Sequence, residues 1–372
     1  MSNTNERTSP HKNKDVVLLI KGLIIGKVLT LLVIGGLLWW LRPRLWSYSD
    51  TTTAQTTESQ TSENVSVTTN GSTYNQVAGI PTGTFKYGGS AAWIPIRQVV
   101  DAQIQQARPE LQLSYIQPAN SNFSSGTGIE MLLNGQLDFA HSSRPLTAAE
   151  KAIAQQQGLT LTEIPVAMDG IAAVVHPSLQ IPGLTVEQLQ QIYQGKITNW
   201  NQLGGENLAI VPYTRHPKDG SPAAIFSTQQ GQQSFGANVR SVSSTTAALR
   251  QVNRTPGAIY YASARAVVHQ CGVKPIPLEE KGDRFVAPYR GSLVSTQECP
   301  TQRNQLNLAA FEDGSYPLTR NLYAIVKQDG SKAQQAGEAY TKLLLSDQGQ
   351  QAIRQAGFAQ AATSTAQNKS TN

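Results

Sequence analysis

Cysteine is scarce in this sequence, and its scarcity argues against a structural zinc site. Cys271 and Cys299 are the only two cysteines in 372 residues, whereas such a site takes about four N or S ligands at characteristic spacings. Both lie in turn-rich sequence, HQCGV and QECPT. Two interpretations remain open, a pair of unrelated free thiols or one disulfide formed in an oxidising compartment. We predict the disulfide, and no metal.

The short motifs of common enzyme classes are also lacking. There is no G-x-S-x-G elbow, no H-E-x-x-H helix and no G-x-x-x-x-G-K-[ST] loop. The GKIT within residues 193–200 follows a predicted helix and does not have the glycine spacing of a phosphate loop. Histidines are dispersed, and only His216, beside Arg215, is placed to touch an anion. The sequence therefore predicts a protein that is not an enzyme and uses no cofactor.

Charge is sparse and slightly positive. Charged residues make up 15% of the chain, and the formal net charge is +6. The lysines and arginines form no run of about five or more, which disfavours nucleic acid as a partner. A mildly positive body favours a small anionic ligand, because its field raises the local concentration of anions.

One long apolar stretch, residues 16–41, predicts a transmembrane helix. About 20 helical residues cross the hydrocarbon of a bilayer, and Trp39, Trp40 and Trp46 mark the far interface. More positive charge precedes the stretch than follows it, so residues 1–15 are predicted to be a cytoplasmic tail. A cleaved signal peptide is the alternative, although WWLRPRLW offers no A-x-A-like cleavage site. We predict a single-pass plasma-membrane protein whose folded part lies in the periplasm or outside the cell.

Two further segments are predicted to be disordered. Residues 42–81 are dominated by Thr, Ser, Gln and Asn, and such a segment cannot bury enough apolar surface to offset the entropy of ordering. It is predicted to be a flexible linker between the membrane and the folded part. A disordered tail is expected at residues 363–372.

Between these ends the apolar pattern alternates between strand and helix. Strands are predicted near 85–90, 111–118, 137–140, 168–177, 208–213, 257–263 and 322–327, and helices near 94–109, 129–133, 149–158, 185–195, 245–254 and 338–357. The alternation predicts an α/β fold with a largely parallel sheet covered on both faces by helices. Ligands of such sheets bind beyond the carboxyl ends of the strands, so the site is expected on the loops that follow strands.

Three of those loops carry residue types that suit an anion. Residues 88–93 and 121–128 are rich in Gly and Ser, and small residues let an anion approach main-chain N–H groups at a helix N-terminus. In the third loop, Arg215 is suited to grip an oxyanion with two hydrogen bonds, Asp219 to orient it and Ser221 to offer a hydroxyl. Any one such loop is more often ordinary turn chemistry, but the three together favour an anion site.

The order of these loops resembles that of the periplasmic phosphate-binding proteins of ABC-type importers. The resemblance covers about residues 82–362 and rests on SSGTG, NGQLDFAHSSRPLT, LQQIYQGKITNWNQLGG, PGAIYYAS and YPLTRNLYAIVK. It implies a type II periplasmic-binding-protein fold, in which two lobes joined by a hinge hold the ligand between them. The first lobe is expected at 82–167 and 285–362, and the second at 168–284.

The resemblance also implies a function. It implies that the chain binds inorganic phosphate outside the cytoplasm and delivers it to the permease subunits of an ABC transporter. One alternative remains open, a tethered sensor that reports phosphate or a related oxyanion to a membrane partner without transport.

Carried over position by position, the resemblance implies a set of residues at the anion. These are Ser90, Ala92 and the main chain of Trp93 from the first loop, Ser125 and Gly126 from the second, and Arg215, Asp219 and Ser221 from the third.

The sequence departs from the family pattern at three places. Ala92 stands where the family often has a hydroxyl residue, and Pro222 with Ala223 replaces a Gly-Thr pair. Ser143 stands where some members have an aspartate that accepts a proton from the ligand. The neighbouring Arg144 either adds positive charge to the cleft or pairs on the surface. Candidate substitutes for the missing acceptor are Asp138, Asp169 and Asp219.

Overall fold

In this computed structural model, residues 72–119, 122–215, 235–280, 284–299 and 301–361 are described. They fall within a single unit that extends from Thr69 to the C-terminus. The predicted transmembrane segment at 16–41, residues 42–71 of the predicted linker and the predicted tail lie outside the described residues. The disorder predicted for the rest of that linker, residues 72–81, is wrong: this part includes η1 (Tyr74–Gln76), and the Tyr74 side chain is fully buried in a core cluster. Among the helices that are described, none has both the length and the apolar character needed to cross a membrane.

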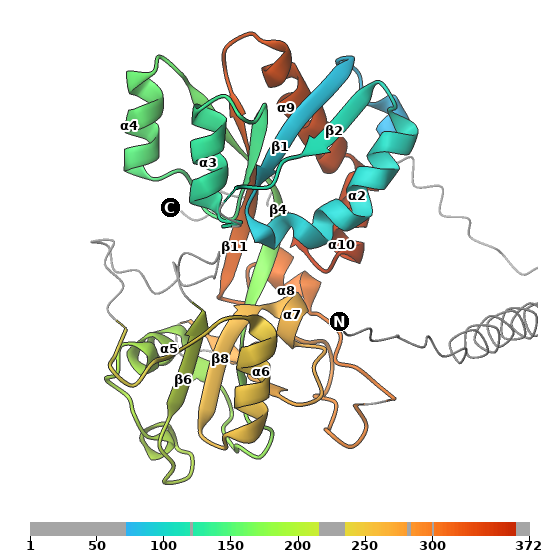
Figure 1. Ribbon diagram of the computed structural model, residues 1–372. Helices are drawn as coiled ribbons and strands as arrows, with labels where there is room; N and C mark the ends of the chain where they lie inside the picture. Colours follow the sequence, from blue (N-terminus) through green and yellow to red (C-terminus); the bar gives the residue numbers. More distant parts are fainter. Residues whose placement is uncertain (1–71, 120–121, 216–234, 281–283, 300, 362–372) are drawn as a thin grey trace, which may run out of the picture. The chain divides into compact units, whose positions relative to one another are not determined.

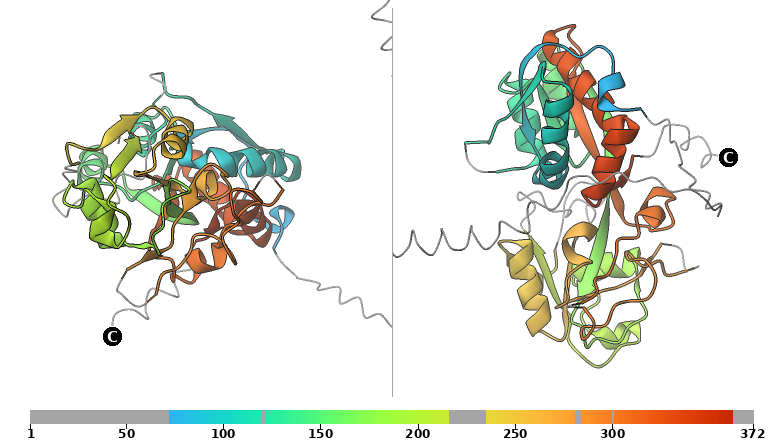
Figure 2. Two further views of the ribbon diagram at one scale, coloured as in Figure 1. Left: turned by 90° about the horizontal axis from the view of Figure 1, so that it is seen from below. Right: turned by 90° about the vertical axis from the view of Figure 1, so that its right-hand side faces the viewer.

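A single long strand, β4 (Leu161–Val175), belongs to both halves of the folded unit. Its first part pairs antiparallel with β11 (Thr319–Lys327) and its last part with β8 (Ala258–Ser263). The strands therefore form one continuous sheet in the order β2-β1-β3-β11-β4-β8-β6-β7, with β9 and β12 also paired to β4. Figure 1 and Figure 2 show β4 running from one half into the other.

The first half is a three-layer α/β/α arrangement. Its strands β1 (Gly83–Gly89), β2 (Leu111–Tyr115) and β3 (Phe139–Ser142) are parallel. Residues of α3 (Ser125–Leu133) pack on one side of the sheet in a cluster with Ala140 and Ile325. The helices α2 (Ile94–Ala107), α9 (Lys332–Leu345) and α10 (Asp347–Gln355) contribute to the other cluster, and α4 (Ala148–Gln156) lies beside α3 (Figure 1).

The second half repeats this plan on a smaller sheet. Here β6 (Val211–Arg215) pairs parallel with β7 (Arg240–Val242) and β8. The core is one cluster that includes the aromatic side chains of Tyr193, Trp200, Tyr260 and Tyr261. The helices of this half are α5 (Val186–Tyr193), α6 (Thr245–Arg254), α7 (Ala264–Val267) and α8 (Leu308–Glu312). The remaining short elements of the whole unit are η1 (Tyr74–Gln76), η2 (Ala91–Trp93), η3 (Trp200–Leu203), β5 (Leu184–Thr185), β9 (Lys274–Pro275), β10 (Leu278–Glu279) and β12 (Ala359–Gln360).

The predicted α/β fold is confirmed, but the strands differ in direction and extent, and β7 and the shortest strands were not predicted. The sheet of each half is parallel apart from the strands that pass between the halves or pair onto β4, and β4 and β11 are antiparallel to their neighbours. The strand predicted at 168–177 begins earlier, at Leu161. Its first residues are only half-buried and include Glu163 and Pro165, so they do not form the continuous apolar run that marked the rest of the strand.

The single helix predicted at 338–357 is two helices. Ser346 separates α9 from α10 and has an extended main chain, with ψ of 159°. Its hydroxyl accepts a hydrogen bond from Gly349 N at 3.1 Å. This N-cap satisfies one of the first free N–H groups of α10 and starts a new helix directly after the first.

The boundary expected at residue 285 differs from the packing. Tyr289, Phe311 and Tyr316 belong to the core of the second half, and the Tyr316 hydroxyl donates to Ile171 O on β4 at 2.8 Å. The chain therefore returns to the first half with β11. The loop-rich composition of residues 285–318 did not indicate which core they cover.

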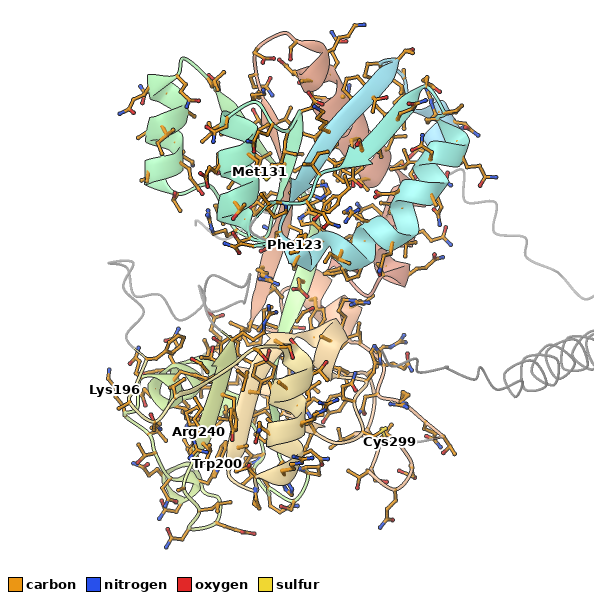
Figure 3. The ribbon with its side chains drawn as sticks, viewed as in Figure 1. Phe123, Met131, Lys196, Trp200, Arg240 and Cys299 are labelled. Atoms are coloured by element: carbon orange, nitrogen blue, oxygen red, sulfur yellow. A yellow bond between two sulfur atoms is a disulfide. The ribbon has the colours of Figure 1, made fainter. Side chains whose placement is uncertain are left out.

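The predicted disulfide is confirmed. Cys271 and Cys299 are bonded, with their Cα atoms 5.4 Å apart, and Figure 3 shows Cys299 in the second half, away from β4. The bond closes a long loop onto the segment after α7, and Cys299 is 2% exposed. Its presence agrees with an oxidising compartment, where disulfides persist.

Replacing both cysteines with serine is expected to lower the free energy of unfolding by about 3 to 4 kcal/mol, because the loop-closure entropy of the unfolded chain is restored. Urea unfolding of the two proteins measures the difference. Reducing agent should lower the unfolding midpoint of the natural chain and leave that of the double variant unchanged. An equal response of both proteins to the reductant would contradict the prediction.

Candidate functional site

A small pocket lies where the two halves meet, beside both crossing strands. Its volume is about 160 Å³, below the roughly 300–1,000 Å³ of pockets that hold drug-sized ligands. It lies at the carboxyl ends of β1, β6 and β8, where ligands of such sheets are expected to bind. Residues that line it include Ala91, Ala92, Asp169, Arg215, Thr245, Tyr260, Ser263, Arg265 and Arg320. A pocket of this size admits a ligand of only a few atoms.

The lining of the pocket is rich in positive charge. Among its described residues are three guanidiniums, of Arg215, Arg265 and Arg320, and one carboxylate, of Asp169. Concave sites lined by one sign of charge focus the field and attract ions of the opposite sign. The arrangement therefore suits an anion.

The first predicted loop is the turn between β1 and α2, and most of it is turned inward. Ser90 is 2% exposed, and its hydroxyl accepts from Ala92 N at 3.3 Å. The Trp93 N–H, which the resemblance placed at the anion, donates to Ser90 O at 3.1 Å. The Trp93 ring is fully buried and stacks on His141 with 3.8 Å between ring centroids. Of these three residues, only Ala92 lines the pocket.

Three serines from different elements form a buried hydroxyl cluster. The Ser90 hydroxyl donates to the Ser143 hydroxyl at 3.0 Å, and the Ser125 hydroxyl lies 3.3 Å from that of Ser143. Ser143 N also donates to Ser125 Oγ at 2.9 Å. The structure thus brings three predicted residues together, but their hydroxyls bond to one another rather than lining the pocket.

Close main-chain packing holds this cluster in place. A Cβ atom on Gly128, in the first turns of α3, would lie 2.5 Å from Gly89 Cα at the end of β1. A Cβ on Gly89 itself would lie 2.3 Å from His141 O, so both positions require glycine. Ala91 N donates to the carbonyl of Phe123 at 2.9 Å, and Figure 3 shows Phe123 at the edge of the first half that faces the second.

A buried, neutral histidine packs against the same loop. His141 is fully buried against Trp93, Tyr87 and Tyr340, and its carbonyl accepts from Ser90 N at 3.0 Å. Burial, followed by the charge of Arg97, lowers the pKa of His141 well below its ordinary value. The imidazole therefore remains uncharged and packs as an aromatic ring.

Arg144 is committed to a carboxylate of its own half. Its Nη1 and Nη2 atoms donate to the two oxygens of Glu150 at 2.8 and 2.7 Å. Burial alone would raise the pKa of Glu150, but these hydrogen bonds and those from the Thr147 cap together hold it below its ordinary value. Of the two interpretations left open by the sequence, the structure has the surface pair. Gly126 is half-exposed in the first turn of α3, next to this pair.

Arg215 lines the pocket from the end of β6. It lies near Tyr260. Burial raises the pKa of Tyr260, and the Thr245 hydrogen bond and the charge of Arg215 oppose that rise. The rest of the third predicted loop, including His216, Asp219, Ser221, Pro222 and Ala223, lies outside the described residues.

Among the three candidate acceptors, Asp169 is the one described in the pocket lining. It is 1% exposed. The hydroxyl of Ser263 donates to its Oδ1 at 2.6 Å, and Arg320 donates twice to its Oδ2, at 2.9 and 3.1 Å. Asp138 instead accepts from a main-chain N–H of β1 at 2.6 Å, and Asp219 is not described. Asp169 therefore joins β4, β8 and β11 at the point where the chain crosses.

Ser263, Arg265 and Arg320 line the pocket but were not predicted as site residues. Two signals were present in the sequence. Arg320 is a charge on a strand that is otherwise mainly apolar, and Asp169 occupies the equivalent place on β4. Their registry, directly opposite each other on adjacent antiparallel strands, depends on the pairing of strands far apart in the sequence. No group of three or more His, Cys, Asp or Glu side chains suited to a metal occurs among the residues that the structure describes.

A two-lobed α/β fold with a small cationic pocket between the lobes defines a solute-binding protein. The PBP superfamily domain matches residues 54–348, and the chain belongs to that superfamily.

The relatives within the superfamily are more specific. The chain is 22% identical over 288 residues to the phosphate-binding protein PstS of Staphylococcus saprophyticus, covering 76% of this chain and 82% of the relative. It is 21% identical over 285 residues to that of Staphylococcus aureus strain USA300, with coverage of 76% and 80%. The resemblance to the phosphate-binding proteins of ABC importers is thereby confirmed.

Solved structures agree with the fold. An ABC-type phosphate transport receptor from Vibrio cholerae superposes with a TM-score of 0.57 at 25% identity, covering 74% of this chain and 99% of the receptor. A candidate phosphate ABC transporter substrate-binding protein from Clostridium perfringens, with bound phosphate, gives a TM-score of 0.57 at 22% identity and coverage of 75% and 100%.

Proposed function

We propose that this chain binds inorganic phosphate outside the cytoplasm and delivers it to the permease of an ABC-type importer. The observation that carries the proposal is the small pocket with three guanidiniums at the carboxyl ends of β1, β6 and β8. A tetrahedral oxyanion is small enough for such a pocket, and guanidiniums present donors in a fork that matches its oxygens. The names of the relatives support phosphate over other oxyanions.

The contacts proposed for the anion come from both halves. Arg215 is the main charged contact, with Asp219 and Ser221 of the same loop, and the first half contributes the main chain around Ala92. The inward-turned hydroxyls of Ser90, Ser125 and Ser143 provide the polar backing of that half. Rotation of a serine side chain about χ1 is enough to turn its hydroxyl toward a ligand.

We also propose that residues 16–41 anchor the chain and that the linker lets the folded part move about the membrane surface. The disulfide supports an extracytoplasmic location, because such bonds persist in oxidising compartments.

Phosphate uptake by a strain without this chain separates the two functions that the sequence left open. Loss of uptake supports delivery to an importer, and normal uptake with an altered phosphate response supports a tethered sensor.

Titration calorimetry of the full-length chain, purified in detergent, tests the binding proposal. Phosphate is expected to bind with a micromolar or smaller Kd, and sulfate much more weakly. A hydrolysis assay on phosphate esters is expected to give no turnover. Absence of binding heat with phosphate, or equal affinity for sulfate, would overturn the assignment of the ligand.

A further inference from the structure

Arg265 occupies an unusual place between the two halves. It belongs to α7 of the second half, whose neighbours Ala264 and Val267 lie in that core. Its guanidinium reaches the first half, where Nε donates to Ala356 O at 2.7 Å. Ala356 and Phe358 belong to the core of the first half. Arg265 therefore bridges the halves beside the pocket that it lines.

The stem and one nitrogen of this side chain are fixed by the turn after α10. Arg265 Cζ lies 5.9 Å from the centroid of the Phe358 ring, within the range of a cation–π contact. Gly357 packs so closely that a Cβ atom there would lie 3.1 Å from Arg265 Cβ. With Nε and the stem held, the guanidinium is oriented in advance and its Nη donors lose little entropy on meeting a ligand.

The charge of Arg265 is less compensated than that of its neighbour. Arg320 pairs with Asp169 at 2.9 Å, and the Asp169 carboxylate also accepts from Ser263. Within the part of the chain that the structure describes, no carboxylate forms an ion pair with Arg265. Burial lowers the pKa of Arg265, and the charge of Asp169 opposes that shift. A half-buried cation with these surroundings gains from an anion in the same pocket.

We infer that Arg265 is a second guanidinium that contacts the bound anion. The inference rests on the proposed function and extends it. Arg215 comes from the strand β6 and Arg265 from α7, so the two cations approach from different elements of the second half. Arg265 also couples ligand binding to the first half through its contact with Ala356 O.

Calorimetry with inorganic phosphate on the full-length chain and its variants tests the inference. Arg265→Gln is expected to weaken phosphate binding by about tenfold to one-hundredfold, because a charge-assisted contact to a desolvated anion is lost. Arg265→Lys keeps the charge and is expected to recover most of that loss. The matched control is Arg354→Gln, which removes a positive charge from α10 but breaks a pair with Glu312 in which Arg354 is 45% exposed. It should leave phosphate binding unchanged.

The outcomes separate this inference from the proposed function. No phosphate binding by the natural chain would overturn the function itself. Normal binding by both the natural chain and Arg265→Gln would overturn only the inference. Equal weakening of the Gln and Lys variants would also overturn it, because the main-chain contact alone would then explain the effect. Arg265→Met retains the packing of the stem and gives the same comparison if the Gln variant does not fold.

Discussion

Replacing Arg215 with alanine is expected to weaken phosphate binding by about 2 to 5 kcal/mol, or roughly 30- to 4,000-fold. Arg215 ends β6 and its side chain lines the pocket between the halves. An anion bound in that pocket is desolvated, so loss of a guanidinium leaves its charge unpaired. Titration calorimetry with phosphate measures the loss of affinity.

Two further variants identify the origin of this loss. Arg215→Lys keeps the charge but not the planar fork, and is expected to bind with an intermediate affinity. Arg240→Ala is the matched control. Arg240 lies on the adjacent strand β7 (Figure 3) and is exposed, and its replacement changes the net charge by the same amount. If Arg240→Ala weakened binding as much as Arg215→Ala, the general field of the protein and not a direct contact would be responsible.

The periodicity of the sequence was sufficient to predict the longer elements of each half, whereas β7, α7 and α8 were not predicted. Amphipathic helices and apolar strands alternate, and caps such as Thr185, which accepts from Gln188 N at 2.9 Å, mark helix starts. The crossing strands were harder to predict. The first part of β4 is half-buried, and among the described strands its residues 161–165 pair with β11 alone, so no local pattern distinguishes such a strand from a loop. The assignment of residues 285–318 to a core depended on long-range packing in the same way.

The sequence indicated which loops contribute to the candidate site, but not the directions in which their side chains point. Gly and Ser in the loops after β1 and β2 indicated two segments that the structure brings together, since Ser90 and Ser125 both contact Ser143. The sequence could not tell whether these hydroxyls face a ligand or one another, because that depends on side-chain rotamers and on neighbours from other elements. Arg144 illustrates the same point, since its partner Glu150 lies on the following helix.

The residues that the sequence missed share a different property. Arg265 and Arg320 acquire their roles from contacts with residues 91 and 151 positions away, at Ala356 and Asp169. Pattern rules act over a few residues and cannot pair such positions. For Arg320 the available signal was a charged residue on a mainly apolar strand, whereas Arg265, on the short helix α7, gave no such signal.

Asp169 and Arg320 form a buried ion pair at the junction of the halves. Asp169→Ala is expected to lower the free energy of unfolding by about 3 to 5 kcal/mol, because it leaves the Arg320 guanidinium buried without its carboxylate. The Arg320 side chain is only 13% exposed and that of Asp169 1%. The two residues face each other across β4 and β11. Urea unfolding of the full-length chain measures the change.

Two comparisons make this prediction specific to the buried pair. Arg354→Gln breaks an ion pair in which the arginine is 45% exposed and is expected to cost at most about 1 kcal/mol. Asp169→Ala combined with Arg320→Met removes both charges while keeping the arginine stem, so the double variant is expected to be more stable than Asp169→Ala alone. A double variant less stable than the single would show that the loss comes from packing around Asp169 rather than from an unpaired charge. The double variant lacks both the Arg320 guanidinium that lines the pocket and the carboxylate that holds Ser263 at the end of β8. Phosphate affinity should therefore be restored less fully than stability, because the removed pair stabilises the fold and also forms part of the pocket.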